Sequence, residues 1–255
     1  MEEVFTEAGA DSDDRQAAKR NYYSRFALAH LQAFRPHFQE GETLGQSPEA
    51  WRNVSEHCLV SGVFADWLAV KLGLSEKDRQ EVVQASLLHD WDKKHESMLM
   101  SQLIKQHNLT LDGLEDFKHE SDDKLRSMGV SDSVIRLMNA NIPSTKHGPQ
   151  SDAEKIVWYI DAFLSNTEPV EIKKRFTNLE RGWDGKEEVA ERAARNRHFS
   201  DLYRTRYEGQ SLYEVQIGLA DKIGSEFSER LGYSGNPDDL PIFLSGQIEE
   251  LYGAE

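Results

Sequence analysis

Helical spacing of apolar residues extends along nearly the whole chain and limits the fold more than any other feature. Between Val54 and Gly73 the apolar residues recur at intervals of three and four, and the glycine ends that pattern. A second segment of this kind ends in the apolar run from Val82 to Leu88. The sequence has no convincing run of alternating β-branched residues and no fixed-period repeat. The pattern therefore predicts an all-α protein.

The same spacing places the other helices along the chain. Asn53 followed by Glu56 resembles a capping box, so the helix around Val54 is predicted to begin there. Glycine and serine residues between Pro36 and Pro48 indicate a connecting loop. Further helices are predicted from about residue 20 and over 118–128, 131–140, 152–166, 170–176, 186–206 and 211–231.

The helices divide the chain into three predicted parts. Residues 1–15 are acidic and poor in bulky apolar groups, so we expect a flexible tail. Residues 16–170 form the main helical domain, and residues 171–255 form a helical extension that packs on the same domain. The apolar stripe of the 211–231 helix is equally compatible with core packing, a lid or a dimer interface, so a homo-oligomer is one option.

The charge balance argues against one large class of partners. Thirty lysines and arginines stand against 45 aspartates and glutamates, which gives a formal net charge of −15. Such a surface repels a phosphate backbone, so no nucleic-acid polymer is expected as a partner. A small anion still requires a local positive site. Residues 171–206 carry a local net charge of +3, and Arg192, Arg195 and Arg197 could contact an anion, although a solvated helix face is the commoner arrangement.

Localisation follows from what the chain lacks. The most apolar stretch, Leu59 to Leu74, is interrupted by Asp66 and Lys71, so no membrane span is expected. The acidic amino terminus is the opposite of a signal or transit peptide. The single cysteine, Cys58, excludes an intramolecular disulfide and a multi-cysteine zinc site. We therefore expect a cytoplasmic protein.

Four potential metal ligands lie in or directly after apolar helices. His57 is near the inward stripe of its helix, His89 and Asp90 directly follow a buried run, and Asp161 has apolar residues on its own helix face. Separately, each could be a hydrogen-bonded core residue or part of a helix end. Together they supply two imidazoles and two carboxylates, which suit manganese, iron, zinc, cobalt or magnesium. One divalent cation would satisfy all four, so the sequence predicts a metal site.

The order and setting of these residues resemble those of the HD superfamily of metal-dependent phosphohydrolases. A first helix contains Asn-Val-Ser-Glu-His ending at His57, a second contains Ala-Ser-Leu-Leu-His-Asp ending at Asp90, and a third ends at Asp161. The resemblance covers about residues 50–165. It implies an HD-domain helical bundle with a helical C-terminal extension, in which residues 16–170 form the metal-binding domain. It also implies that His57, His89, Asp90 and Asp161 are the ligands.

Residues around this quartet are candidates for phosphate binding and catalysis. The segment from Arg52 to His57 is similar to a helix of the 5′-deoxynucleotidase branch, which implies that Arg52 contacts substrate phosphate. Lys93 stands where that branch usually has a glutamate, as in another large branch of the superfamily. On a continuous helix Lys93 would share a face with His89 and could place its ammonium against phosphate. Glu56 is a further candidate for proton transfer, beside its capping role. Asp92 could hydrogen-bond a ligand histidine or act as a base, but surface exposure is the expected alternative.

Two more histidines raise the possibility of a second metal ion. His119 and His147 fall between the His89-Asp90 pair and Asp161, where binuclear members of the superfamily have two extra histidines. His147 lies about four positions later than that resemblance implies. Both histidines are equally compatible with surface positions.

The function expected from these features is hydrolysis of a phosphate ester of a small molecule, in the first place a nucleotide, by metal-activated water. An alternative enzyme is a diiron oxygenase similar to the myo-inositol oxygenase side of the superfamily, which would need both His119 and His147. A third alternative is a non-catalytic helical interaction module whose C-terminal third binds a protein.

Overall fold

The computed structural model describes residues 7–39, 52–106, 109–140, 148–182 and 187–253. Twelve α-helices, three short 3-10 segments and one two-stranded hairpin make up these residues, so the protein is all-α as predicted. The helices are α1 (Glu7–Ala29), α2 (Arg35–Gln39), α3 (Arg52–Lys71), α4 (Glu76–Leu88), α5 (Lys93–Lys105), α6 (Leu111–Ser127), α7 (Asp132–Asn139), α8 (Asp152–Phe163), α9 (Ile172–Arg181), α10 (Ala190–Leu202), α11 (Leu212–Leu231) and α12 (Leu240–Glu249).

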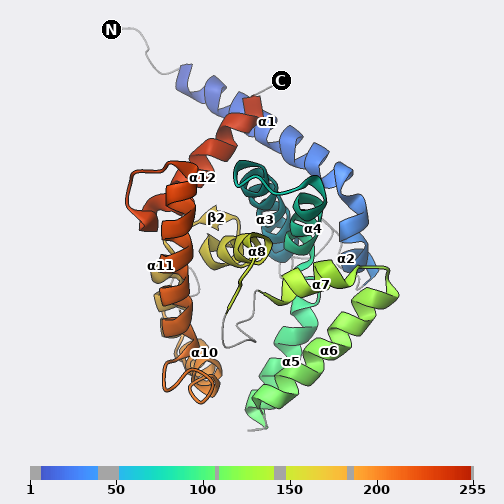
Figure 1. The fold of residues 1–255 in the computed structure, drawn as a ribbon, viewed down its shortest axis with the longest axis vertical. Coiled ribbons are helices and arrows are strands. Elements are labelled where there is room, and N and C mark those ends of the chain that lie inside the picture. Colours follow the sequence, from blue (N-terminus) through green and yellow to red (C-terminus); the bar gives the residue numbers. More distant parts are fainter. Residues whose placement is uncertain (1–6, 40–51, 107–108, 141–147, 183–186, 254–255) are drawn as a thin grey trace.

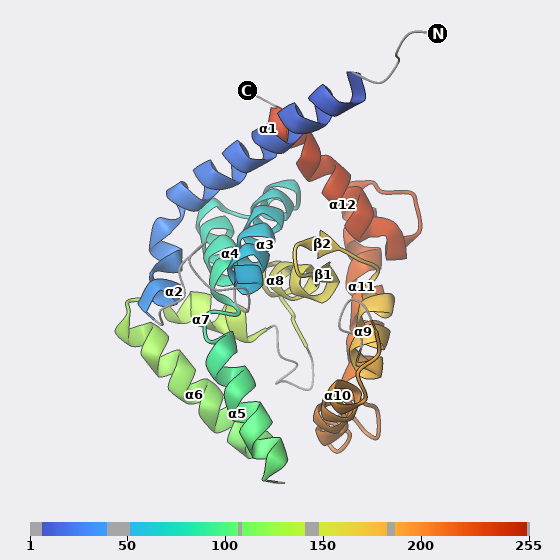
Figure 2. The same ribbon diagram turned by 180° about the vertical axis from the view of Figure 1, so that it is seen from behind.

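Helices α3, α4 and α8 form the centre of the molecule (Figures 1 and 2). The chain reverses between α3 and α4 at Gly73, whose φ of 76° is readily adopted by glycine. Helix α8 begins with a capping box between Ser151 and Glu154 and is buried on almost all sides. Its Trp158 and Tyr159 are among the largest fully buried side chains. These three helices position the candidate site.

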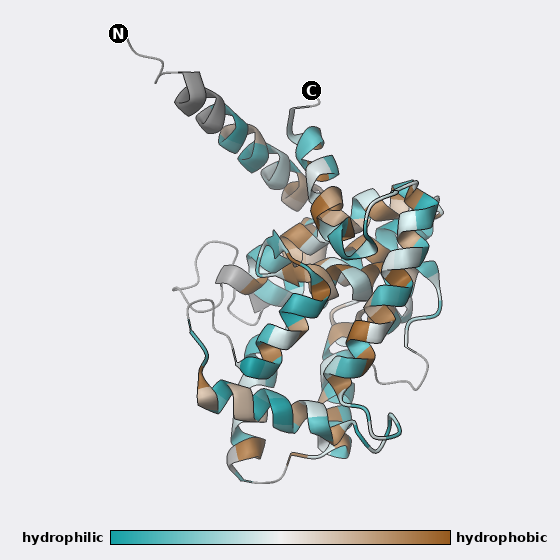
Figure 3. Cartoon of the chain, turned by 90° about the vertical axis from the view of Figure 1, so that its left-hand side faces the viewer, coloured by the Kyte–Doolittle hydropathy of each residue, from teal (hydrophilic) through white to brown (hydrophobic). Residues whose placement is uncertain are grey.

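The other helices surround this centre. Helices α5 and α6 lie side by side as one arm, and α9, α10 and α11 form the opposite side (Figures 1 and 2). The N-terminal part of α1 extends beyond the other helices (Figure 3). One hydrophobic core includes residues from both sides of position 171, as the edge-to-face contact of Tyr159 with Phe227 illustrates. Helices α9, α11 and α12 are thus packed on the same core as α3, α4 and α8.

A short hairpin follows α8. Strands β1 (Leu164–Ser165) and β2 (Glu168–Pro169) pair in antiparallel register, and Asn166 in the connecting turn has a φ of 55°. Asparagine tolerates this left-handed conformation better than most residues. The helix predicted over 152–166 therefore ends at Phe163, because the chain becomes extended at Leu164.

Several predicted boundaries were wrong. Helices α5 and α12 were not predicted. Helix α6 was predicted to begin at residue 118, but it begins at Leu111, because the Thr110 side chain caps it there. Helix α3 begins before Asn53, which therefore lies within the helix and not at its N-cap. Pro36, at the start of the predicted loop, lies in the first turn of α2, where proline costs no helical hydrogen bond; most of the remaining loop lies outside the described residues.

The predicted flexible tail is also partly helical, because α1 begins at Glu7. Several alanines within residues 7–18 favour a helix. Arg15 forms an ion pair with Glu249 of α12, which gives this part of α1 a contact with the body of the protein. Among the described residues, no helix is both long and apolar enough to cross a membrane.

Gly182, which ends α9, offers a test of this packing. Its φ is 73°, and an added Cβ would lie 2.4 Å from the backbone nitrogen of Ala193. We expect Gly182→Ala to lower the free energy of unfolding by about 2–4 kcal/mol, because left-handed strain and overpacking act together. Urea denaturation measures this difference.

Gly232 provides the matched control, since its φ is 68° but an added Cβ would meet no atom within 4 Å. Gly232→Ala is expected to cost only the strain, about 1–2 kcal/mol. Equal destabilisation by the two substitutions would contradict the close contact at Gly182.

Candidate metal centre

Three helices bring the four predicted ligands to one place. Helix α3 carries His57, the C-terminal end of α4 leads into His89 and Asp90, and α8 carries Asp161. The Nε2 atoms of the two histidines are 3.0 Å apart. Asp161 Oδ1 lies 3.3 Å from His57 Nε2 and 3.6 Å from His89 Nε2. Asp90 Oδ2 lies 3.8 Å from His89 Nε2. Residues up to 104 positions apart thus converge on one point.

Backbone carbonyl groups fix the tautomer of both histidines. His57 Nδ1 lies 2.6 Å from the carbonyl oxygen of Asn166, and His89 Nδ1 lies 2.7 Å from that of Ser86. A carbonyl oxygen only accepts, so each Nδ1 carries the hydrogen and donates it. In the neutral rings both Nε2 atoms then have lone pairs, and these face each other and the Asp161 carboxylate. Only a cation can make this arrangement favourable.

A proton or a metal ion could be that cation. Burial lowers the pKa of His89, but the nearby Cys58, Asp90 and Asp161 raise the pKa more, and it lies well above its ordinary value. Burial likewise raises the pKa of Asp161, but contact with the histidines and the charge of Arg175 hold it well below the ordinary value. The centre thus favours a positive charge between ionised carboxylates.

The spacing of the donor atoms fits a divalent ion. Donors bound at about 2.1 Å to one ion lie about 3.0 Å apart at right angles and about 3.4 Å apart in a tetrahedron. The measured separations among the His57, His89 and Asp161 donors are 3.0, 3.3 and 3.6 Å. The donors of His57, His89 and Asp90 also lie within 4.8 Å of one another. Hydrogen bonds from Nδ1 to carbonyl oxygens are the usual support of histidine ligands.

The end of α4 supplies part of this support. The last carbonyl groups of a helix have no partner within it. Here the Ser86 carbonyl accepts from His89, the Leu87 carbonyl accepts from His37 Nε2 at 3.0 Å, and the Leu88 carbonyl accepts from the Trp91 amide. His37 is almost completely buried. It therefore holds the turn that presents His89 and Asp90.

Cationic side chains lie beside the centre. Lys93 Nζ is 3.3 Å from Asp90 Oδ1 and 3.1 Å from Glu96 Oε2, and these two carboxylates raise the pKa of Lys93. Arg175 of α9 donates from Nη1 to the Asp161 carbonyl, and its Nη2 lies 3.7 Å from Asp161 Oδ1. Two cations thus accompany the two carboxylates of the quartet.

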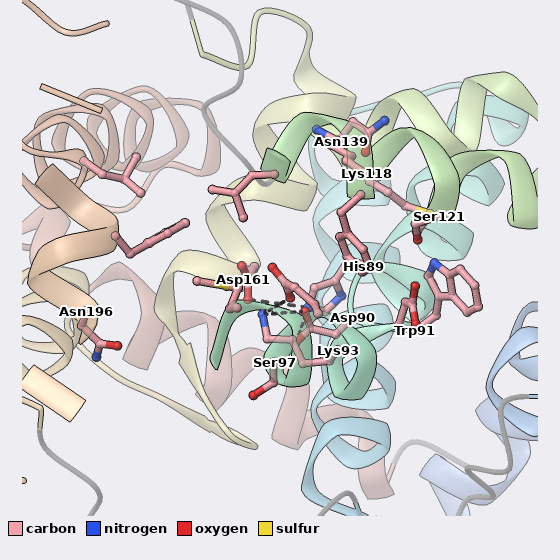
Figure 4. Close-up of a pocket in the computed structure, with 18 of the residues that line it drawn as sticks. His89, Asp90, Trp91, Lys93, Ser97, Lys118, Ser121, Asn139, Asp161 and Asn196 are labelled. Carbon is pink, nitrogen blue, oxygen red and sulfur yellow. Dashed lines mark ion pairs between the residues drawn. The ribbon is translucent and has the colours of Figure 1, made fainter. Parts of the chain in front are cut away.

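The centre opens on a cavity of about 430 Å³. His89, Asp90, Lys93 and Asp161 lie together at one part of its wall, as Figure 4 shows. The arm of α5 and α6 forms one side of the cavity, with α10 and α11 opposite. A volume of this size lies within the range of small-molecule sites.

The other predicted site residues have different positions. Glu56 is half-buried on α3 and does not line the cavity. His119 is exposed on α6 and is also outside the cavity lining. Arg52 begins α3, but its side chain is outside the described part of the structure, and His147 lies outside the described residues altogether. Asp92, for which surface exposure was expected, is buried, with Oδ1 3.6 Å from His95 Nδ1.

Sequence reasoning missed three residues that support the centre. Arg175 falls in a predicted helix, but its contact with Asp161 depends on how α9 packs on α8. His37 had no distinctive sequence context. Asn166 acts through its backbone carbonyl, which every residue type possesses; only its tolerance of a positive φ offered a signal.

Metal binding can be tested with an isosteric change. We expect Asp161→Asn to lower the affinity for zinc or manganese by at least about tenfold, because the substitution removes a ligand charge while keeping its shape. Isothermal titration calorimetry on chelator-treated protein measures the affinity. His119→Asn is expected to bind as much metal as the parent protein. A metal equivalent lost with His119 would instead show a binuclear site.

The buried His37 predicts a pH dependence of stability. Burial lowers the pKa of His37 to about 4, so the unfolded chain binds more protons between pH 6.5 and 4. This stabilisation is complete above pH 6.5 and is lost as the pH falls towards 4. When the pH falls from 7.5 to 5, the free energy of unfolding of the metal-free parent protein is expected to decrease by about 2 kcal/mol more than that of the His37→Gln variant. Urea titrations at the two pH values measure this difference, and identical losses would contradict it.

No protein-family model, curated protein or solved structure matches the chain. The case for the site therefore depends on its geometry. The convergence of donors was predicted from the sequence. The structure places the His57, His89 and Asp161 donors within 3.6 Å of one another and the His57, His89 and Asp90 donors within 4.8 Å.

Proposed function

We propose that the protein is a metal-dependent phosphohydrolase that cleaves a phosphate ester of a small cytoplasmic molecule, with nucleotides as the first class to test. The observation that carries this proposal is the meeting of the His57 and His89 Nε2 atoms with Asp161 Oδ1, all within 3.6 Å, beside a cavity whose wall includes Lys93. This arrangement supports joint binding of a divalent cation and an anion.

His57, His89, Asp90 and Asp161 would hold one divalent ion of manganese, iron, zinc, cobalt or magnesium. When bound, such an ion lowers the pKa of a coordinated water and polarises a phosphoryl oxygen. The carboxylates of Asp90 and Asp161 balance its charge. This balance leaves the neighbouring cations available to an anionic substrate.

Lys93 is the residue best placed to bind the phosphate. Asp90 and Glu96 raise its pKa, so Lys93 stays protonated and suits the role of hydrogen-bond donor to phosphate oxygen. It cannot serve as a base in that state. Arg175 holds the backbone of Asp161 and adds positive charge behind that carboxylate. Its part is to position Asp161.

The proposed substrate is small for two reasons. The cavity has a volume of about 430 Å³, which suits a single metabolite. The net charge of −15 repels extended polyanions. A nucleotide is favoured within this class by the similarity of the Arg52–His57 segment to the 5′-deoxynucleotidase branch.

The oxygenase alternative requires His119 and His147 as additional ligands. The exposed side chain of His119 lies outside the cavity lining, so the described geometry gives this alternative no support. Iron content and oxygen uptake would distinguish the two enzymes. A non-catalytic interaction module would retain neither nucleotide nor aryl phosphate hydrolysis when loaded with metal.

Hydrolysis of p-nitrophenyl phosphate and 5′-nucleoside monophosphates, with each metal added in turn, tests the proposal. We expect Lys93→Gln to lower kcat/KM by about 100-fold with metal content unchanged, because it removes a charged donor to the phosphate. Lys94→Gln, an adjacent exposed position with the same charge change, is the control and should retain full activity. No hydrolysis by the metal-loaded parent protein would refute the function.

A further inference from the structure

The charged groups of the cavity are unequally paired. Each lining carboxylate has a partner: Asp90 and Glu96 contact Lys93, Asp161 contacts His57, Asp122 accepts from Asn139 at 2.9 Å, and Asp92 contacts His95. The lining also contains three lysine or arginine side chains, Lys93, Lys118 and Arg195. Of these, Lys93 is engaged by its two carboxylates.

Lys118 and Arg195 form no hydrogen bond or ion pair with the residues that the structure describes. Lys118 belongs to α6, and Arg195 belongs to α10 on the opposite side. Both side chains line the cavity, in which Figure 4 shows Lys118 near Asn139. The two unpaired cations thus reach one cavity from helices on its opposite sides.

The ammonium of Lys118 is available to a ligand in the cavity. Lys118 is partly buried, and burial lowers its pKa against the attraction of Asp122 and Glu115. Asp122 uses Oδ2 to accept a hydrogen bond from Asn139, and Glu115 pairs with Arg206 at 2.6 Å. Neither lies close enough to neutralise Lys118 directly. An anionic ligand would provide the missing partner.

An anionic group bound by Lys118 would be separate from the phosphate at the metal centre, where Lys93 already supplies a cation. We propose that the substrate carries a second anionic group, a phosphate or a carboxylate, and that Lys118 binds it while Arg195 adds positive potential from the opposite wall. The proposal rests on the function proposed above and narrows its substrate class, nucleotides included, to phosphate esters that carry a second anionic group. Simple phosphomonoesters would leave Lys118 unpaired.

Calorimetric binding to the metal-free protein tests the second contact apart from catalysis. The probes are fructose 1,6-bisphosphate against fructose 6-phosphate, and 6-phosphogluconate against glucose 6-phosphate, which separate a second phosphate from a carboxylate. We expect the bis-anion of at least one pair to bind about tenfold more tightly than its mono-anion. Lys118→Gln should abolish that preference while circular dichroism shows an unchanged helix content.

Lys174→Gln is the matched control, because Lys174 is exposed on α9 and outside the cavity lining. It should keep the full preference. Equal binding of mono- and bis-anions by the parent protein, or a preference retained in Lys118→Gln, would overturn the assignment of Lys118. Hydrolysis of phosphate esters with no such preference would refute this inference alone, whereas the preference without any metal-dependent hydrolysis would refute the proposed function alone.

Discussion

Two imidazole Nε2 atoms that lie 3.0 Å apart, with the Asp161 carboxylate beside them, set the main constraint on this structure. The Ser86 and Asn166 carbonyls fix the hydrogens on the opposite ring nitrogens, so the rings cannot relieve the contact by changing tautomer. A proton or a metal ion shared among His57, His89 and Asp161 makes this contact favourable. The packing of α3, α4 and α8 around one core is what maintains that contact.

Helix ends and a tight hairpin provide the supports of the centre. The carbonyl groups that α4 leaves unpaired receive hydrogen bonds from His89 and His37, so an unavoidable feature of any helix end becomes part of the site. The hairpin after α8 turns through Asn166 and presents its carbonyl to His57. These contacts cost the fold little free energy, because backbone groups at such positions need hydrogen-bond partners in any case.

In the described part of the structure, the cavity contains cations without a partner on an otherwise acidic protein. The net charge is −15, and the cavity lining combines five carboxylates, each with a partner, with Lys93, Lys118 and Arg195, of which only Lys93 pairs with a described residue. Local cations on an acidic body favour small anions over polymers, because long polyanions also meet the repulsive surface. Small anions, once inside, interact mainly with the nearby cations in a region of reduced solvent screening.

Helices were predicted correctly from the sequence where the spacing of apolar residues reflects a buried face, and they were missed where it does not. The buried α8 was recognised around Asp161, but α5 was missed; its Met98 is largely exposed, so its apolar residues do not mark one buried face. Helix α12 was not predicted; it contains Pro241 in its first turn, where proline is tolerated. The supporting contacts of His37 and Arg175 had no usable sequence signal, and Asn166 offered only its tolerance of a positive φ.

The sequence by itself determined the all-α class, the acidic surface and the four candidate ligands, because helical periodicity and ionisable groups buried in apolar segments are local properties. Only the tertiary structure decided that those ligands meet, which tautomers they adopt and which cations of the cavity remain unpaired. These features depend on distances between segments far apart in the chain and on backbone carbonyl groups, which are the same in every residue. Packing, and not residue identity alone, therefore creates the centre.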